Sequence, residues 1–226
     1  MTSRFSQEKD LTEAVRISWL GHSMFLLEDA GHRLVTDPYG EGVGYQLPDV
    51  EADIILVSHD HFDHSNTSLV KGNPVVVRDP EPQDSAGIRI EGLSTFHDDK
   101  EGAERGANVI FRWNMQGIDF AHLGDLGHLP GADVNSGLEG VDVLFIPVGG
   151  TFTIDDAQAA QVVKTLSPSI AIPMHFKTSA CAFPIKTADP FTAHFYDVDI
   201  TGKEPVYLSR QDLPDQTLIL VMDYLA

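Results

Sequence analysis

The chain has 226 residues, of which 15 are lysine or arginine and 34 are aspartate or glutamate, so its formal net charge is −19. Such a surface repels nucleic-acid phosphates and anionic membranes, and no basic cluster offsets it, so neither partner is expected. No apolar run is long enough to span a membrane, and the N-terminus lacks the basic start and apolar stretch of a signal peptide, which predicts a cytoplasmic protein. Cys181 is the single cysteine, which excludes an internal disulfide and directs any metal site toward imidazole and carboxylate ligands.

Short apolar runs separated by glycine and proline predict many strands. In chain order, strands are expected at 14–19, 24–27, 33–36, 53–57, 74–77, 88–93, 108–113, 118–123, 141–147 and 169–174. Helical periodicity is clearest from Ile154 to Leu166, with Thr153 as N-cap and Ser167-Pro168 as the end. We therefore expect one α+β domain over residues 1–226, in which sheets pack on each other with helices outside. The apolar segments 183–185 and 218–222 could pack internally or against a partner, which leaves the oligomeric state open.

The segment SHDHFDHS, residues 58–65, gathers three histidines and two aspartates directly after the apolar run 53–57. That run is apolar on both faces, as is typical of a buried strand, so the cluster lies just past a strand end, where functional loops gather. A tight loop that opens a helix can aim four side chains at one point, namely those of His59, His61, Asp63 and His64. Because zinc and its neighbours prefer imidazole and carboxylate when thiolate is absent, the segment predicts a metal site.

The stretch HDHFDH at 59–64 resembles the signature of the metallo-β-lactamase fold superfamily, whose members are four-layer αββα sandwiches with one or two metals at the sheet edges. Further segments are similar, in order, to a branch of uncharacterised metal-dependent hydrolases that also resembles ascorbate-6-phosphate lactonase. They are GHSMFLLEDAGHRLVTDPY at 21–39, FHDD at 96–99, HLGDLG at 122–127, FIPVGGTFT at 145–153 and IPMHF at 172–176.

The resemblance implies a ligand set. It assigns His59, His61 and His97 to a first metal, Asp63, His64 and His175 to a second, and Asp125 to a bridge between them. His97, Asp125 and His175 each follow an expected strand, as the first cluster does. The segment of His97 also fits an ordinary acidic loop, because Asp98 and Asp99 follow it and the excursion EGAERGAN separates it from Asp125.

Three further residues are candidates for positions close to the predicted metal site. Asp37 ends the strand at 33–36, where the superfamily usually has an aspartate that orients a ligand histidine; a plain Asp-Pro turn is compatible with that role. His22 could lie near the metals or form a plain turn between strands, and the sequence does not favour one over the other. His128 is expected to be a solvent-facing loop residue rather than a substrate contact, and the remaining histidines, His32, His122 and His194, are expected to be structural.

Two cations held close together favour hydrolysis, because they can share and activate a water molecule. The expected activity is that of a metal-dependent hydrolase acting on a small ester, lactone or phosphodiester, with Asp63 and Asp125 as catalytic carboxylates and two divalent cations, zinc first, then manganese, nickel or iron. Two alternatives stay open: a mononuclear iron oxygenase of the sulfur-dioxygenase type, and a metal-binding member without catalysis. Gly149-Gly150-Thr151 could offer backbone N–H groups to a phosphate, but Asp155 and Asp156 argue against one.

Overall fold

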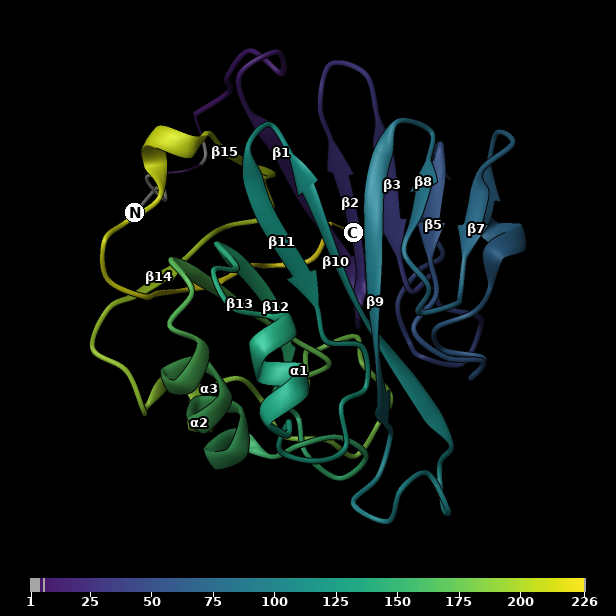
Figure 1. The fold of residues 1–226 in the computed structure, drawn as a ribbon, viewed down its shortest axis with the longest axis vertical. Helices are drawn as coiled ribbons and strands as arrows, with labels where there is room; N and C mark the ends of the chain where they lie inside the picture. The colour runs from purple at the N-terminus through teal and green to yellow at the C-terminus, as the bar shows by residue number, and fades with distance from the viewer. Residues whose placement is uncertain (1–4, 6, 226) are drawn as a thin grey trace.

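A computed structural model describes residue 5 and residues 7–225 of the chain, and these form two large sheets and one small one (Figure 1). The first sheet is six-stranded, in the order β15 (Val206–Leu208), β1 (Val15–Gly21), β2 (Met24–Glu28), β3 (Arg33–Thr36), β5 (Ile54–Leu56) and β7 (Val75–Val77). The second sheet is eight-stranded, in the order β14 (Val198–Ile200), β16 (Leu218–Val221), β13 (Ile170–Met174), β12 (Val143–Pro147), β11 (Ile118–His122), β10 (Ala107–Met115), β9 (Ile88–Phe96) and β8 (Gln83–Ser85). The small sheet pairs β4 (Val50–Glu51) with β6 (Val70–Lys71).

The two large sheets share one apolar core. Alternate side chains of each strand point to opposite faces, so residues such as Trp19 and Phe25 of the first sheet meet Phe111 and Phe145 of the second. The rings of Phe25 and Phe145 have centroids 4.5 Å apart, and both side chains are fully buried. A sandwich is therefore held together by burial between its sheets, which leaves the strand ends free to carry polar loops.

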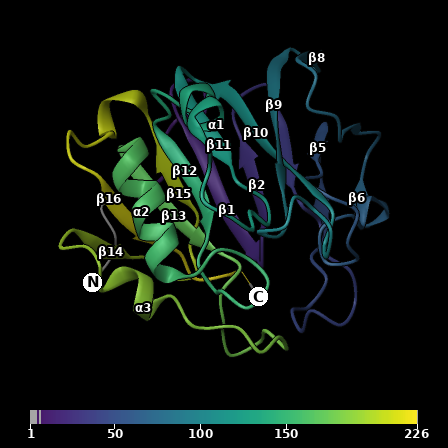
Figure 2. The ribbon, with the colours of Figure 1, turned by 60° about the horizontal axis from the view of Figure 1, so that its bottom comes forward.

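The α-helices lie in the connections between strands of the second sheet. Its strands β11, β12, β13 and β16 run parallel, and parallel neighbours need crossover connections, which here contain α1 (Ala132–Gly137) and α2 (Asp156–Leu166). Figure 2 shows α1 and α2 lying over β11 to β13, with α3 (Asp189–Thr192) beside α2. No helix among the described residues is long and apolar enough to cross a membrane.

The outer face of the first sheet buries a second, smaller apolar cluster that includes Tyr39, Tyr45, Val50 and Ile185. Loops, the β4–β6 sheet and the 3₁₀ helix η1 (Thr67–Leu69) cover it; a second 3₁₀ helix, η2 (Arg210–Asp212), follows β15. The α+β sandwich expected from the sequence is confirmed, and within the described residues its fourth layer is made of these segments rather than of α-helix.

All ten expected strands are present, and the apolar segment 218–222 packs internally as β16. Two expectations were wrong in detail. Helix α2 starts at Asp156 with Asp155 as its N-cap, because Asp155 and Gln158 form a reciprocal capping box while the Ile154 N–H is already bonded to the Leu126 carbonyl. The segment 59–64 does not open an α-helix; it forms turns that lead only to η1.

Candidate metal centre

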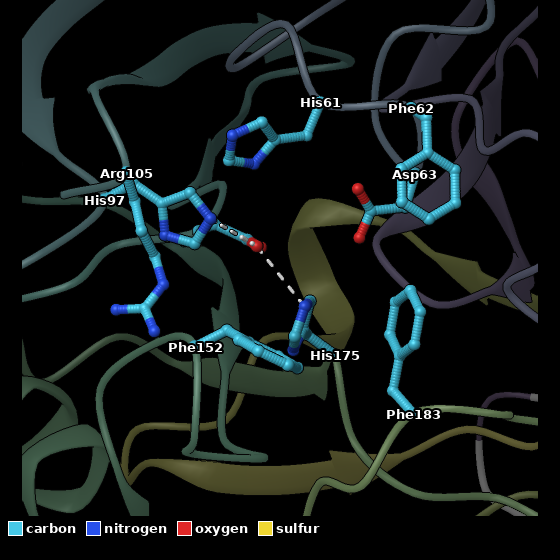
Figure 3. A pocket seen from close by; sticks show the side chains of 9 residues that line it. His61, Phe62, Asp63, His97, Arg105, Phe152, His175 and Phe183 are labelled. Atoms are coloured by element: carbon cyan, nitrogen blue, oxygen red, sulfur yellow. Dashed lines mark ion pairs between the residues drawn. The ribbon is translucent and has the colours of Figure 1, made fainter.

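The predicted site residues all lie just past the carboxyl ends of strands, from both sheets. Asp37 follows β3, the 59–64 segment follows β5, His97 follows β9, Asp125 follows β11 and His175 follows β13. Because the sandwich brings these strand ends to one edge, side chains separated by more than a hundred positions meet in one cleft of about 330 Å³. Figure 3 shows His61, Asp63, His97 and His175 around this cleft.

Three clusters of possible ligand atoms overlap at this edge, each with its atoms within 4.8 Å of one another. One contains His59, His61 and His97, and another contains Asp63, His64 and His175 together with His22; a third joins His59 and His64 to Asp125. The histidine sets that the resemblance implied are therefore brought together, His97 included. His22, whose role the sequence left undecided, joins the second cluster.

Asp125 lies between the clusters. Its Oδ2 atom is 3.3 Å from Nε2 of His64, of His97 and of His175, two of which Figure 3 draws as dashed lines. Burial raises the pKa of Asp125, but His175 and His64 outweigh it and hold that pKa well below its usual value. The backbone N–H of Asp125 donates to Asn108 Oδ1 at 2.9 Å, which holds the backbone at this position. This residue is thus an ionised, buried carboxylate surrounded by imidazoles.

Asp37 organises the 59–64 segment from beneath. Its carboxylate accepts hydrogen bonds from the Ser58 N–H at 2.8 Å, from Ser58 Oγ at 2.7 Å and from His64 Nδ1 at 2.9 Å. Since the single Ser58 hydroxyl hydrogen is given to Asp37, the His59 Nδ1–H donates to Ser58 Oγ, which lies 2.9 Å away. In both His59 and His64, Nε2 is therefore the ring nitrogen left free for the donor cluster that these residues form with Asp125.

Those Nε2 atoms provide a test of whether a cation fits. His59 Nε2, His64 Nε2 and Asp125 Oδ1 are buried without a hydrogen-bond partner among the described residues. An unpartnered buried polar atom costs about 1–3 kcal/mol, so a cluster of them at one point calls for a ligand that accepts lone pairs. Imidazole and carboxylate donors with these free atoms suit a divalent cation, and the residues present fit such a group.

The electrostatics keep several of these imidazoles neutral. Burial lowers the pKa of His59 to about 3 and that of His22 to about 4, and neighbouring histidines push in the same direction. His64 differs: burial opposes its charge, but the Asp125 and Asp37 carboxylates outweigh burial and hold its pKa well above the usual value. Neutral imidazole is the form that binds a metal, and a cation would displace the proton from His64.

The backbone is strained at three of these residues. His22, Asp37 and His175 have φ angles of 53°, 38° and 51°, in the left-handed region that non-glycine residues rarely adopt. Such strain costs on the order of 1–3 kcal/mol per residue and persists where the surroundings determine the conformation. Three of the eight non-glycine residues with positive φ among the described residues are thus at the strand ends that carry the cluster, where such strain often accompanies a functional site.

The other histidines lie outside the cleft. His128 accepts from the Phe96 N–H at 3.3 Å, His32 contacts Asp29 and His194 contacts Asp156. His122 is buried beneath Asp37, with Nε2 3.0 Å from the Ser23 carbonyl. Sequence reasoning missed the cleft wall formed by Phe62, Arg105, Phe152 and Phe183; an exposed phenylalanine inside a polar ligand motif was the available signal.

Comparisons with known proteins agree with this geometry. A family model described as the beta-lactamase superfamily domain matches residues 16–175. A UPF0173 protein of Pyrococcus furiosus is 32% identical over 75% of this chain and 87% of its own length, and a UPF0173 metal-dependent hydrolase of Thermoplasma acidophilum is 30% identical over 79% and 88%. A crystal structure from Thermotoga maritima, described as that of a Zn-dependent hydrolase of the metallo-beta-lactamase superfamily, superimposes with a TM-score of 0.77 at 35% identity, covering 93% of this chain and 99% of the other. The chain belongs to the metallo-β-lactamase superfamily, as a metal-dependent hydrolase of the UPF0173 family.

Proposed function

We propose that the chain hydrolyses a small ester, lactone or phosphodiester at a binuclear centre. The observation that carries the proposal is the convergence, at one edge of the sandwich, of seven donor side chains, several with unpartnered buried atoms: His59, His61, Asp63, His64, His97, Asp125 and His175. A structural metal site is usually closed by four ligands, whereas seven donors, five of which line an open cleft, leave positions for water and substrate. A cleft of about 330 Å³ suits a small molecule.

Within this proposal the donors divide into two sets. His59, His61 and His97 would hold the first cation, Asp63, His64 and His175 the second, and Asp125 would be shared. Two divalent cations, when bound, would supply Lewis-acid activation of water and of the bond under attack. A histidine and carboxylate donor set without thiolate favours zinc, and it also suits manganese, nickel and iron.

In this proposal, carboxylates would transfer protons and would orient neighbouring side chains. Both carboxylates line the cleft, but the Asp63 side chain is 11% exposed and the Asp125 side chain is 2% exposed. Asp63 would therefore be the carboxylate that more readily takes a proton from a water molecule and returns it to the leaving group. His22 Nε2, 3.2 Å from Asp63 Oδ2, orients that carboxylate, and Asp37 fixes the ring of His64.

Elemental analysis of protein purified without chelator tests the proposal. We expect about two equivalents of zinc or manganese per chain, together with hydrolysis of at least one member of a panel of aryl esters, lactones and phosphodiesters. His61→Ala removes one donor of the first set and should lower the metal content and abolish turnover. His32→Ala removes a histidine outside the cleft and should change neither.

The alternatives give different results. One equivalent of iron, with oxygen consumed and no hydrolysis, would identify a mononuclear oxygenase. Full metal content without any turnover across the panel would favour a metal-binding protein without catalysis. Protein that holds far less than one equivalent after purification and after incubation with added zinc would refute the metal centre itself.

A further inference from the structure

The wall of the metal cleft carries three phenylalanines and one arginine that the proposed hydrolytic chemistry does not use. Phe62, Phe152, Phe183 and Arg105 line the same cleft as the ligand side chains. Phe62 is 58% exposed although it lies between two ligand residues of the HDHFDH segment. A large apolar side chain exposed beside polar, metal-binding groups marks a surface that binds something apolar.

The four side chains form a continuous wall. The ring centroids of Phe62 and Phe183 are 6.2 Å apart and those of Phe183 and Phe152 are 6.1 Å apart. Arg105 Cζ then lies 5.7 Å from the centroid of the Phe152 ring. In Figure 3, Arg105 and Phe152 lie on the His97 side of the cleft, and Phe62 and Phe183 lie on the Asp63 side. The wall is apolar at one end and cationic at the other.

Arg105 differs from the other arginines of the molecule. Every other arginine within the described part of the chain has a carboxylate partner, whereas no described carboxylate pairs with the guanidinium of Arg105. In a chain with a net charge of −19, acidic partners are abundant, so an unpaired guanidinium beside the cleft is unexpected for a residue that serves only the fold. Its planar, delocalised charge suits a carboxylate or a phosphate of a ligand.

The loop that carries Arg105 is built around a buried carboxylate. Asp98, which directly follows His97, accepts backbone hydrogen bonds from Lys100, Gly102, Glu104 and Arg105 at 2.7–2.9 Å. The segment between β9 and β10 is therefore folded into a fixed turn, and its backbone is anchored at Arg105 itself. A guanidinium on an anchored loop loses less conformational freedom when it binds a ligand.

We infer that the substrate is a small molecule with an apolar body and one anionic group, and that Arg105 binds this group while Phe62, Phe152 and Phe183 cover the body. The inference rests on the proposed hydrolytic function, for which it names the substrate class. Carboxylate and phosphate share the chemistry that Arg105 recognises, and matched probes separate them. Arg105 acts as a specificity-determining residue, and the bond that is cleaved lies over the metal ligands.

Three aryl acetates with the same ring test the inference in the metal-loaded protein. They are 4-acetoxybenzoate, 4-acetoxyphenyl phosphate and the uncharged methyl 4-acetoxybenzoate. We expect Arg105→Ala to raise KM about 10-fold for one or both anionic esters and to leave the methyl ester unchanged, since a charge-assisted bond at a partly exposed site is worth about one factor of ten. Arg105→Lys should restore part of the loss. Arg89→Ala, which removes a surface charge paired with Asp84, is the matched control.

A binding measurement keeps the inference testable when none of the esters is hydrolysed. Calorimetric titration of the metal-loaded protein with 4-hydroxybenzoate, phenyl phosphate and methyl 4-hydroxybenzoate should show tighter binding of an anion, and Arg105→Ala should abolish that preference. Absence of turnover with an intact, Arg105-dependent anion preference would count against the hydrolase and for the anion site. The inference would be overturned if the protein bound anionic and neutral ligands equally, or if Arg105→Ala weakened the binding of both equally. Arg105 would then only pack against the Phe152 ring.

Discussion

At the scale of single residues, Asp37 holds the candidate ligand His64 in place. It is 1% exposed, and its two oxygens accept the Ser58 N–H, the Ser58 hydroxyl and the His64 Nδ1–H. Burial raises its pKa, but His64 outweighs that effect and lowers it, so the carboxylate stays ionised. The hydrogen bond to Nδ1 fixes the ring orientation of His64 and leaves Nε2 as the atom that faces the cleft.

Asp37→Asn should therefore weaken metal binding without unfolding the protein. Asparagine tolerates the positive φ of 38° at this position, so the substitution should leave the backbone conformation unchanged. Its amide lacks the charge that holds the His64 Nδ1–H, and we expect the affinity for one of two metals to fall roughly 10–100-fold. Competition with a chelating dye measures this. Unchanged affinity for both metals would show that Asp37 only forms the turn before Pro38.

His22 is the second residue whose role depends on close neighbours. It is wholly buried, its ring centroid is 4.2 Å from that of His175, and Nδ1 has no partner among the described residues. His22→Asn keeps a residue that accepts a φ of 53° but removes the contact with Asp63. We expect metal content to fall from about two equivalents toward one, with the first cluster still filled. If the variant kept both metals at unchanged affinity, His22 would have only a structural role in the turn between β1 and β2.

At the scale of elements, glycines allow the ligand-bearing strand ends to approach one another. A Cβ added at Gly127, two residues after Asp125, would lie 2.2 Å from the His97 carbonyl carbon and from the Asp98 nitrogen. These are backbone atoms, which cannot move aside as a flexible side chain can. The loop after β11 and the end of β9 are thus packed backbone against backbone, and this contact sets the separation of His97 and Asp125.

Gly127→Ala should disturb that contact. We expect a loss of about 1–3 kcal/mol in the free energy of unfolding, and a weaker first metal site, because the added methyl group pushes His97 away from Asp125. Gly131→Ala is the matched control in the same loop, since a Cβ there meets nothing within 4 Å. Urea unfolding and metal titration of both variants measure the effect. If the two variants had the same free energy of unfolding and the same metal affinity, the loop would be able to shift and accept the added methyl group.

The junction of β3 and β5 carries a pH-dependent contact outside the candidate metal centre. Asp53 accepts from the Arg33 N–H at 2.8 Å and pairs with its guanidinium at 3.3 Å. Partial burial raises the pKa of Asp53, but the bonds from Arg33 outweigh it, so the pKa lies below 3.8. A carboxyl whose pKa is lowered on folding stabilises the protein above its unfolded pKa, and this stabilisation disappears as the pH falls through the folded pKa.

Asp53→Asn should cost about 0.5–1 kcal/mol at pH 7, a small value because the pair is partly exposed. The difference between wild type and variant should persist at pH 5 and shrink once the pH falls below 3.8, the ordinary pKa of an aspartate in the unfolded chain. Urea unfolding of both proteins at matched pH measures it, and using the difference cancels the other titrating groups. A difference that stays constant down to about pH 3 would show that the bond, not the charge, carries the effect.

The elements also show how far sequence reasoning reaches. Strands were predictable because apolar runs ended by glycine or proline depend on local sequence. The candidate ligands came from the resemblance to the superfamily, and their places after such runs supported them. Short strands such as β14 and β15 were missed, since each forms by pairing with a segment outside its own local sequence, β14 with β16 and β15 with the distant β1. Arg105 was missed for a similar reason: its position depends on how its loop folds around Asp98. Residues that act through long-range packing leave little local signal.

At the scale of the whole molecule, the hydrophobic core and the candidate metal centre are built from different residues. The main core lies between the two sheets and is built from side chains such as Trp113, Phe120 and Phe145, none of which belongs to the ligand clusters. Asp37, Asp63 and Asp125 bring three carboxylates to the sheet edge of a chain that already carries a net charge of −19. Bound cations would relieve both the local and the overall repulsion.

Metal removal should therefore lower stability without abolishing the fold. A ligand present at about 1,000 times its Kd stabilises the folded state by about 4 kcal/mol, so chelation should lower Tm while the far-UV circular dichroism stays unchanged. Added salt should raise the Tm of the metal-free protein more than that of the loaded protein, because it screens the surface repulsion from a net charge of −19 that bound cations would otherwise reduce. Readdition of zinc should restore Tm and activity together. Loss of the circular dichroism signal on chelation would instead mean that the metals hold the sandwich together and that the core between the sheets is insufficient alone.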